Sequence, residues 1–486
     1  MDEEIKNDNL LEEEKKIERE EKRRKLKKIL IPTIILLVIS ISFIVLILLL
    51  RFKLGSYDGE KFDGTIKAKY IIKNNNQRLR IINKPKKDII IISLYNEKGK
   101  IRDFKEFDYN IEILVNKSFP SDFEIKYKGK LTDLTSLFAY NSYLEEIDLT
   151  DINSSEVTSM KEMFYRCYNL KKVNMSNLVT SNVESIDDMF FQNEKLEILD
   201  INNFNFSKIT SSTSAFQNCY KLSKINIKDF DLTKITDASY MFANCYSLKE
   251  IALKNNESQS VPIDIKSIFS GDYSLKEINL KNFDKKIISK IDYAFNKCKS
   301  LTSIDLSKFD TSQVTSIDSL FSNCHQLQKL DLPYLNVSNT RMFQDAFFNC
   351  TSLKSLDLSN FNTNKAKFMS NLFYGCSSLT SVDLSNYTIN VFSLLNLFGG
   401  CKSLENVILS VKNVTNIEGM FKDCSSLKYL DLSNFSTKSV LWKKNFFPEE
   451  VTNATVVYNS TIFSKITDYI KPKEGIIYID ISINLY

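Results

Sequence analysis

A repeat of 26 residues dominates this sequence. Each copy contains the motif F-x-x-C or a close variant, and successive motif phenylalanines lie 23 to 27 residues apart. A unit of this length cannot enclose its own apolar face, so the copies must stack to form one continuous core. Phe138 belongs to a degenerate first copy. The other phenylalanines that we expect in this core are Phe164, Phe190, Phe216, Phe242, Phe269, Phe295, Phe321, Phe347, Phe373, Phe398 and Phe421.

The spacing of apolar residues predicts a short strand and a short helix in each copy. In Leu353-x-x-Leu356-x-Leu358, the last two leucines share one face of a strand and Asp357 points the other way, because side chains alternate along a strand. We therefore predict an α/β fold, a right-handed solenoid with a parallel β ribbon and short helices. The helical spacing is clearest at Val314, Ile317, Leu320, Phe321, Cys324 and Leu327.

This repeat resembles the BspA-like leucine-rich repeats, whose units follow the type MFxxCxSLxxLDLSxFxTSxVTxM. Residues 294–319 read AFNKCKSLTSIDLSKFDTSQVTSIDS, and residues 346–371 read AFFNCTSLKSLDLSNFNTNKAKFMSN. The resemblance implies a leucine-rich-repeat solenoid on the surface of a bacterium or protist, with a role in adhesion or interaction. It leaves the ligand undefined, since one fold serves many functions.

The regions on either side of the repeats predict a membrane anchor and two caps. Residues 29–50 carry no charge over 22 positions and follow a basic cluster, which predicts an uncleaved single-pass signal anchor at the plasma membrane, with the N-terminus cytoplasmic and the C-terminus extracellular. A cleaved signal peptide is the alternative. The expected organisation is a cytoplasmic tail (1–28), a transmembrane helix (29–50), a β-rich juxtamembrane and N-terminal cap region (51–130), about twelve repeats (131–447) and a C-terminal cap (448–486).

All nine cysteines occupy one position of the repeat, three residues after the motif phenylalanine. A column of buried free thiols is one interpretation, because a free cysteine behaves as a small apolar residue. Disulfides between neighbouring copies are the other, since adjacent positions in such a column are close enough to bridge. The absence of any C-x-x-C motif disfavours zinc. The cysteines are Cys167, Cys219, Cys245, Cys298, Cys324, Cys350, Cys376, Cys401 and Cys424.

Two sets of polar residues recur outside the predicted core. An aspartate or asparagine follows the strand pattern in most copies, as at Asp305, Asp331, Asp357 and Asp383. Such a carboxylate column suits Ca²⁺, but we favour solvation of the carboxylates and predict no metal site. Four N-x-[ST] sequons in expected loops or caps are the candidate glycosylation sites: Asn116, Asn256, Asn453 and Asn459.

The composition argues against several functional classes. A net charge of +5 over 486 residues gives no basic excess for nucleic acid. The single His325 rules out a multi-histidine metal site, and G-x-S-x-G, G-x-G-x-x-G and H-E-x-x-H are absent. We expect no enzyme activity, no cofactor and no nucleic-acid partner. With the resemblance, this favours a membrane-anchored surface protein that recognises a protein or glycan of a host, prey or neighbouring cell. The alternative is a structural coat component without a specific ligand.

Overall fold

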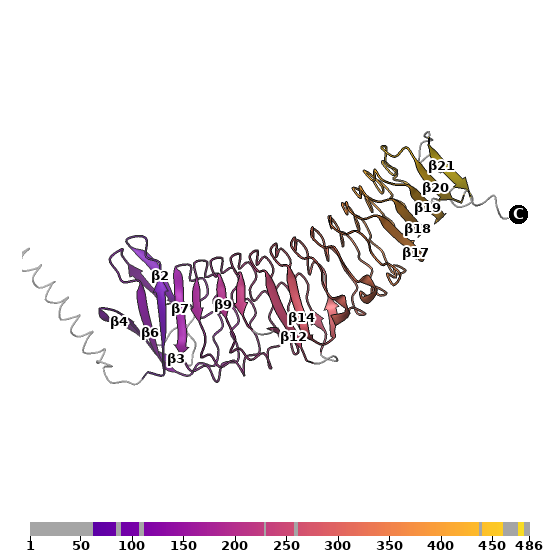
Figure 1. Cartoon of the computed structure of the whole chain (residues 1–486). Coiled ribbons are helices and arrows are strands. Elements are labelled where there is room, and N and C mark those ends of the chain that lie inside the picture. The colour runs from indigo at the N-terminus through magenta and orange to yellow at the C-terminus, as the bar shows by residue number, and fades with distance from the viewer. Residues whose placement is uncertain are drawn as a thin grey trace, which may run out of the picture. The chain divides into compact units, whose positions relative to one another are not determined.

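The structure, a computed structural model, describes residues 62–83, 89–105, 111–227, 230–256, 261–436, 440–459 and 475–480 (Figure 1). The chain divides into two compact units, Met1–Lys61 and Phe62–Tyr486. All described residues belong to the second unit.

The predicted membrane anchor finds no support in this structure. The expected tail (1–28) and transmembrane segment (29–50) lie outside the described residues. Within the described part of the chain, no helix has the length and apolar character that crossing a bilayer requires. The prediction of a transmembrane helix before the solenoid, and of a single-pass plasma-membrane location, is therefore withdrawn.

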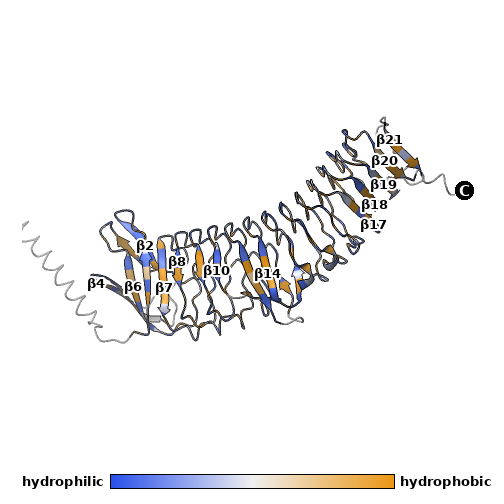
Figure 2. Ribbon diagram, viewed as in Figure 1, coloured by the Kyte–Doolittle hydropathy of each residue, from blue (hydrophilic) through white to orange (hydrophobic). Residues whose placement is uncertain are grey.

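The repeat region is a β-solenoid in which each copy forms one coil (Figure 1). Short strands on one side of the coils pair in parallel, as β9 (Ile198–Asp200) does with β10 (Lys224–Asn226), and apolar and polar residues alternate along the strands (Figure 2). In the copy that predicted a strand, Leu358 is buried and Asp357 exposed, but residues 353–358 form no regular strand. The other coil strands are β7 (Leu144–Asp151), β8 (Lys172–Asn174), β11 (Phe230–Asp231), β12 (Glu250–Asn255), β13 (Ile263–Asp264), β14 (Glu277–Phe283), β15 (Lys286–Lys290), β16 (Phe309–Asp310), β17 (Ser381–Asn390), β18 (Asn406–Lys412) and β19 (Tyr429–Phe435).

Antiparallel strands precede the first coil and join its sheet. The strand order is β4-β3-β6-β1-β7-β8, with β1 antiparallel to β7, while β2 pairs separately with β5. This pairing covers an edge of the first coil strand that would otherwise be open. The six strands are β1 (Gly64–Tyr70), β2 (Gln77–Ile82), β3 (Ile89–Asn96), β4 (Gly99–Lys105), β5 (Ile111–Val115) and β6 (Asp122–Gly129).

The last described strands continue the ribbon. β20 (Ala454–Tyr458) and β21 (Ile476–Asp480) pair in parallel with each other, and the sheet runs β17-β18-β19-β20-β21. The part of the predicted C-terminal cap that the structure describes therefore adds strands to the solenoid in the same direction as the coils before it.

The prediction of short helices, and with it the α/β fold class, is wrong. The helical elements among the described residues are two 3-10 turns, η1 (Leu306–Lys308) and η2 (Leu332–Tyr334). The segment around Phe321, which carries helical spacing in the sequence, is a series of tight turns. The described repeats are thus built from strands and turns.

Two features of the backbone prevent a helix around Phe321. Ser319 and Asn323 have φ angles of 53° and 62°, in the left-handed region that ends a right-handed helix. The Phe321 N–H donates to the Ala346 carbonyl of the next coil at 2.8 Å, whereas the following N–H, of Ser322, closes a local turn onto Ser319 at 3.2 Å. An α-helix would need both N–H groups for its own carbonyls. Bonding between coils and helix formation therefore exclude each other.

The motif phenylalanines form one continuous stack through the core. The eleven rings from Phe164 to Phe421 are 0–2% exposed. From Phe138 onward, each ring stacks on that of the next coil, with centroids 5.2 to 6.1 Å apart and interplanar angles of 1 to 17°. The stack ends at Phe446, which meets Phe421 edge-on at 80°. Each ring thus depends on its two neighbours.

Replacing one ring of the stack is expected to destabilise the solenoid strongly. Phe321→Ala should lower the free energy of unfolding by about 3–5 kcal/mol, because the buried ring leaves a cavity. Denaturant unfolding measures the loss, and hydrogen exchange should place it in the coils next to Phe321. The control is Phe368→Ala, since Phe368 is 52% exposed. A loss below about 1 kcal/mol at Phe321 would show that its ring lies outside the core.

The sign of the change in unfolding free energy on a glycine substitution distinguishes a turn from a helix. Lys297 is exposed and has a φ of 62°, which costs a residue with a side chain about 1–2 kcal/mol relative to glycine. We expect Lys297→Gly to raise the free energy of unfolding by up to about 1 kcal/mol. The control Asn296→Gly, at a neighbour without positive φ, should lower it. A loss of about 1 kcal/mol at Lys297→Gly, typical of glycine inside a helix, would restore the helical interpretation.

Candidate binding surface

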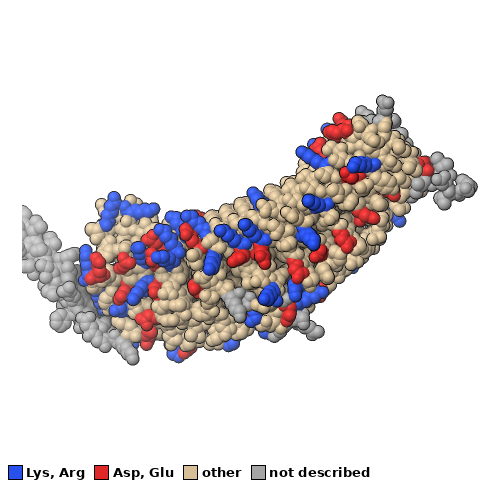
Figure 3. Space-filling model, viewed as in Figure 1, with Lys and Arg blue, Asp and Glu red and all other residues tan. Residues whose placement is uncertain are grey.

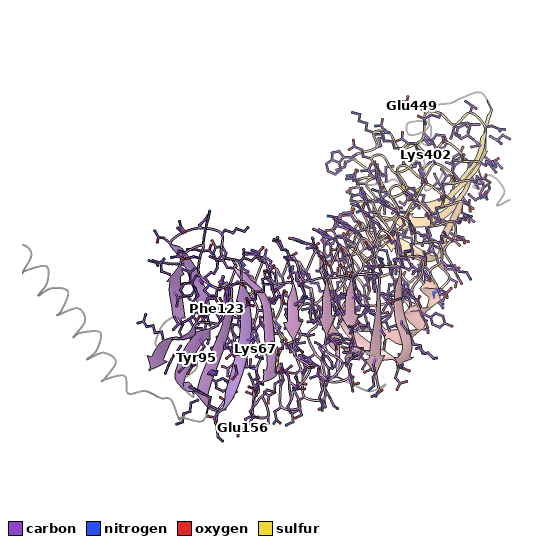
Figure 4. All side chains as sticks on the ribbon, turned by 60° about the vertical axis from the view of Figure 1, so that its left-hand side comes forward. Lys67, Tyr95, Phe123, Glu156, Lys402 and Glu449 are labelled. Atoms are coloured by element: carbon purple, nitrogen blue, oxygen red, sulfur yellow. The ribbon has the colours of Figure 1, made fainter. Side chains whose placement is uncertain are left out.

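An open groove lies on the strand side of the first coils. Its volume is about 800 Å³, and side chains of β1, β6, β7, β8 and β9 line it. Lys67 and Phe123, which line this groove, and Tyr95 nearby all come from the N-terminal strands (Figure 4). The N-terminal strands therefore supply part of the surface that a partner of the first coils would meet.

Charged side chains of both signs cross this first groove. The Lys69 ammonium lies 3.9 Å from the Glu145 carboxylate and 3.5 Å from that of Glu146, and the Lys172 ammonium lies 3.8 Å from Glu146. Solvent-exposed ion pairs of this kind contribute at most about 1 kcal/mol to stability. Their larger effect is on the potential that a partner meets, which sets specificity and association rate.

A second groove follows directly along the ribbon. Its volume is about 950 Å³, and it lies over β10, β12 and β14. Because β9 pairs with β10, the two grooves adjoin. Lysines and acidic residues are also interspersed on the face seen in Figure 3, so neither charge forms a block there. The exposed charges of the second groove are Lys224, Lys249, Lys276, Glu250 and Glu277.

The charges of the second groove are not used by the fold. None of the five forms an ion pair with another residue that the structure describes. The sequence predicts the strand side as the binding surface but shows no concentrated binding feature there. The grooves could not be predicted from the sequence, because they depend on how the outward side chains of successive coils are spaced.

The carboxylate column binds the backbone of its own coil. In Asp305, Asp357 and Asp383, Oδ1 accepts the N–H two residues further on at 2.9 to 3.0 Å, which is the geometry of an Asx turn. Hydrogen bonds from Ser359 hold the pKa of Asp357 below its usual range. Among the described residues, no group of three or more His, Cys, Asp or Glu is arranged to hold a metal ion.

The cysteine column lies inside the core next to the phenylalanine stack. All nine cysteines are buried free thiols. The Cys324 Sγ donates to the Phe295 carbonyl of the preceding coil at 3.1 Å, and the other eight thiols make the same bond at 3.1 to 3.2 Å. Burial raises the pKa of Cys167, Cys219 and Cys376 to about 12. The thiol is therefore a hydrogen-bond donor between coils as well as a small apolar group.

The coils without a cysteine show what this position requires. Asn193 fills it in one coil, fully buried, and its Nδ2 donates to the Phe164 carbonyl at 2.8 Å, as a thiol would. Asp272 fills it in another, where its Oδ1 accepts the Cys245 N–H at 2.7 Å. Burial raises the pKa of Asp272 well above its usual range, which favours the neutral acid. The position thus holds a small uncharged donor in the coils with a cysteine and at Asn193, and at Asp272 burial favours an uncharged group.

The candidate glycosylation sites lie at the surface of the described unit. Asn116, Asn256 and Asn453 are exposed, and Asn459 is half-buried. Asn116 Oδ1 accepts the Ser118 N–H at 3.1 Å. Their modification remains a prediction.

The thiols are expected to resist alkylation in the folded protein. We expect few to react at a pH just above 9.0, the ordinary thiol pKa, whereas at least about seven of the nine should react after denaturation without reductant. Counting alkylated cysteines by mass spectrometry measures both states. The raised pKa values also predict that stability falls as pH rises from 9.0 towards about 12, because the unfolded state then binds fewer protons.

The matched control is Cys324→Ala, which removes one thiol and should lower the denatured count by one. Peptides that link Cys324 to Cys350 would contradict the prediction. They would show that covalent bonds join neighbouring coils.

Comparison with solved structures gives distant similarity only. A T. pallidum leucine-rich repeat protein, TpLRR, is 18% identical, with 48% of this chain and 78% of that one covered and a TM-score of 0.20. The TLR13 chain of a TLR13–ssRNA13 complex is 14% identical, with 67% of this chain and 62% of that one covered and a TM-score of 0.19. No curated protein matches the chain.

Comparison with protein families gives a match over about two-thirds of the chain. The family described as "Mycoplasma protein of unknown function, DUF285" matches three times, at residues 132–256, 263–387 and 382–467. The stacked coils confirm the expectation of a repeat solenoid, while the BspA-like name stays a prediction. By this match and by its array of stacked coils, the chain belongs to the DUF285 family.

Proposed function

We propose that the protein is a recognition module that binds a partner protein or glycan across the strand side of its solenoid. One observation carries this proposal: the second groove holds Lys224, Lys249, Lys276, Glu250 and Glu277 over three successive coils, exposed and without ion-pair partners among the described residues. Side chains that the fold does not use are available for a ligand.

The arrangement of the two grooves supports a macromolecular partner. They adjoin through the β9–β10 pair and together cover the coils from β7 to β14. Stacked repeats build extended surfaces of this kind, on which one partner contacts several units. Interspersed charges of both signs favour a partner with a complementary pattern over a uniformly charged polymer.

Charge reversal in the second groove tests the proposal. We expect the full chain, immobilised and exposed to a glycan array and to solubilised surface proteins, to bind a discrete partner. The variant Lys224→Glu/Lys249→Glu/Lys276→Glu should weaken binding of that partner at least about tenfold, since it inverts the potential of the groove. Surface plasmon resonance with the purified partner measures the change.

The control reverses three charges on the turn side of the solenoid. Lys297→Glu/Lys402→Glu/Lys422→Glu makes the same change of net charge at exposed positions outside both grooves; Lys402 is labelled in Figure 4. It should leave binding unchanged. Equal binding by both triple variants and the unmodified chain would place the recognition surface elsewhere.

A further inference from the structure

A row of exposed apolar side chains crosses the last coils, away from both grooves. We name Met342, Phe368, Phe392, Leu441 and Trp442 the apolar patch. Their exposed fractions are 38, 52, 71, 71 and 54%, respectively. They come from four coils, and the region contains the one tryptophan of the chain.

The backbone holds the apolar patch at two adjacent positions of successive coils. Met342, Phe368 and Trp442 lie on a ladder of parallel bridges that also contains Ser393 and Asn416. Phe392 and Leu441 lie one residue before that ladder. Met342 bridges Phe368 directly, and Asn416 bridges Trp442 two coils further on. At the position before the ladder, the Thr415 N–H donates to the Phe392 carbonyl at 2.9 Å, and the Leu441 N–H donates to the Thr415 carbonyl at 2.8 Å. The patch spans five coils, because the coil of Asn416 lies between those of Phe392 and Trp442. At about 4.8 Å between coils, its length is roughly 20 Å.

Earlier coils show that this ladder has no structural need for apolar residues. The bridge positions there are occupied by Ser159, Ser185, Ser211 and Asp237, which pair one after another in the same way. In the last coils, Met342, Phe368 and Trp442 take ladder positions that serine and aspartate fill elsewhere. Large apolar side chains that stay in water at such positions mark an interaction surface rather than a packing requirement.

A basic rim surrounds the apolar patch. Arg341, Lys367 and Lys444 are exposed within two residues of members of the patch, and Asp345 and Glu418 on the same run of coils are half-buried. Methionine, aromatic residues and arginine are enriched in protein–protein interfaces, and tryptophan and arginine in the residues that dominate their binding energy. The combination of apolar centre and basic rim therefore fits an anionic partner that also carries apolar side chains.

We propose that the apolar patch docks a short acidic segment of a partner protein. The apolar side chains of the segment contact Phe368, Phe392 and Trp442, and its carboxylates face Arg341 and Lys367. An extended segment of about six residues spans the patch. This proposal is independent of the strand-side proposal, because the two surfaces share no residue.

A protein segment fits this surface better than a membrane does. Insertion into a bilayer needs an apolar tip that reaches past the headgroups, whereas this patch lies along a ladder and is interrupted by Thr415 and Asn416. Met342 and Leu441 can contact an apolar side chain of a peptide. The polar residues within the patch, Thr415 and Asn416, can donate hydrogen bonds to backbone carbonyls of the peptide.

Selection of displayed peptides tests the assignment. A library of random peptides of about twelve residues is selected on the full chain, and the retained peptides are then measured on the variant Phe392→Ser/Leu441→Ser. We expect the retained peptides to combine aspartate or glutamate with apolar residues. Because Trp442 is the single tryptophan, retained peptides without tryptophan should shift its fluorescence to shorter wavelength as they bury it.

Matched variants separate this patch from other surfaces. Phe392→Ser/Leu441→Ser should weaken a selected peptide at least about tenfold, with an unchanged thermal midpoint because both residues are 71% exposed. Arg341→Glu/Lys367→Glu should also weaken binding and reduce its salt dependence. The control Ile198→Ser, at a 55% exposed apolar residue on the strand side, and the triple lysine variant of the second groove should bind the peptide normally.

Three outcomes would overturn the proposal. The first is a set of selected peptides without an acidic excess, and the second is a set that binds Phe392→Ser/Leu441→Ser as well as the unmodified chain. The third is a shift of Trp442 emission by vesicles of phosphatidylserine and phosphatidylcholine when no selected peptide produces one, which would assign the patch to a lipid surface.

Discussion

The structure depends on one set of interactions, the hydrogen bonds that alternate N–H groups of each turn donate to the next coil. The Phe321–Ala346 bond is one example. Because every second N–H leaves its own coil, a helix cannot form, and the intervening N–H groups close tight turns that need left-handed residues such as Asn323. The same bonds fix the distance between coils, and so bring each motif phenylalanine into contact with the next.

The polar groups of the core follow from that stacking. A carbonyl such as that of Phe295 faces the interior and needs a donor, because a buried unpaired carbonyl is costly. The Cys324 thiol supplies the donor without charge, and Asn193 does so in a coil that lacks the cysteine. Asp272 meets the same position as a carboxyl group whose pKa is raised by burial. The column is therefore a hydrogen-bonding device, which is consistent with thiols that stay reduced.

The described solenoid offers two surfaces of different chemistry. The strand side of the earlier coils carries grooves with charges of both signs, among them Lys249 and Glu250. The later coils carry Trp442 on the bridge ladder and Phe392 one residue before that ladder, both exposed to water beside a basic rim. One repeat can support both because its core positions are fixed while its outward positions are free to vary.

Periodicity alone determined which residues stack: the burial of Phe321 and Leu358 follows from a repeat that cannot enclose its own apolar face. The path of the backbone between them could not be decided from spacing, since intervals of three and four are shared by a helix and by successive tight turns. A local signal existed, because Asn, Asp or Gly fill eight of the twelve left-handed positions before the cysteine column, as at Asn349 and Gly375. The partners of the N–H groups, the pairing of β1 with β7 and the grooves were decided only by the tertiary structure, because each joins residues of different coils or of segments far apart in the chain.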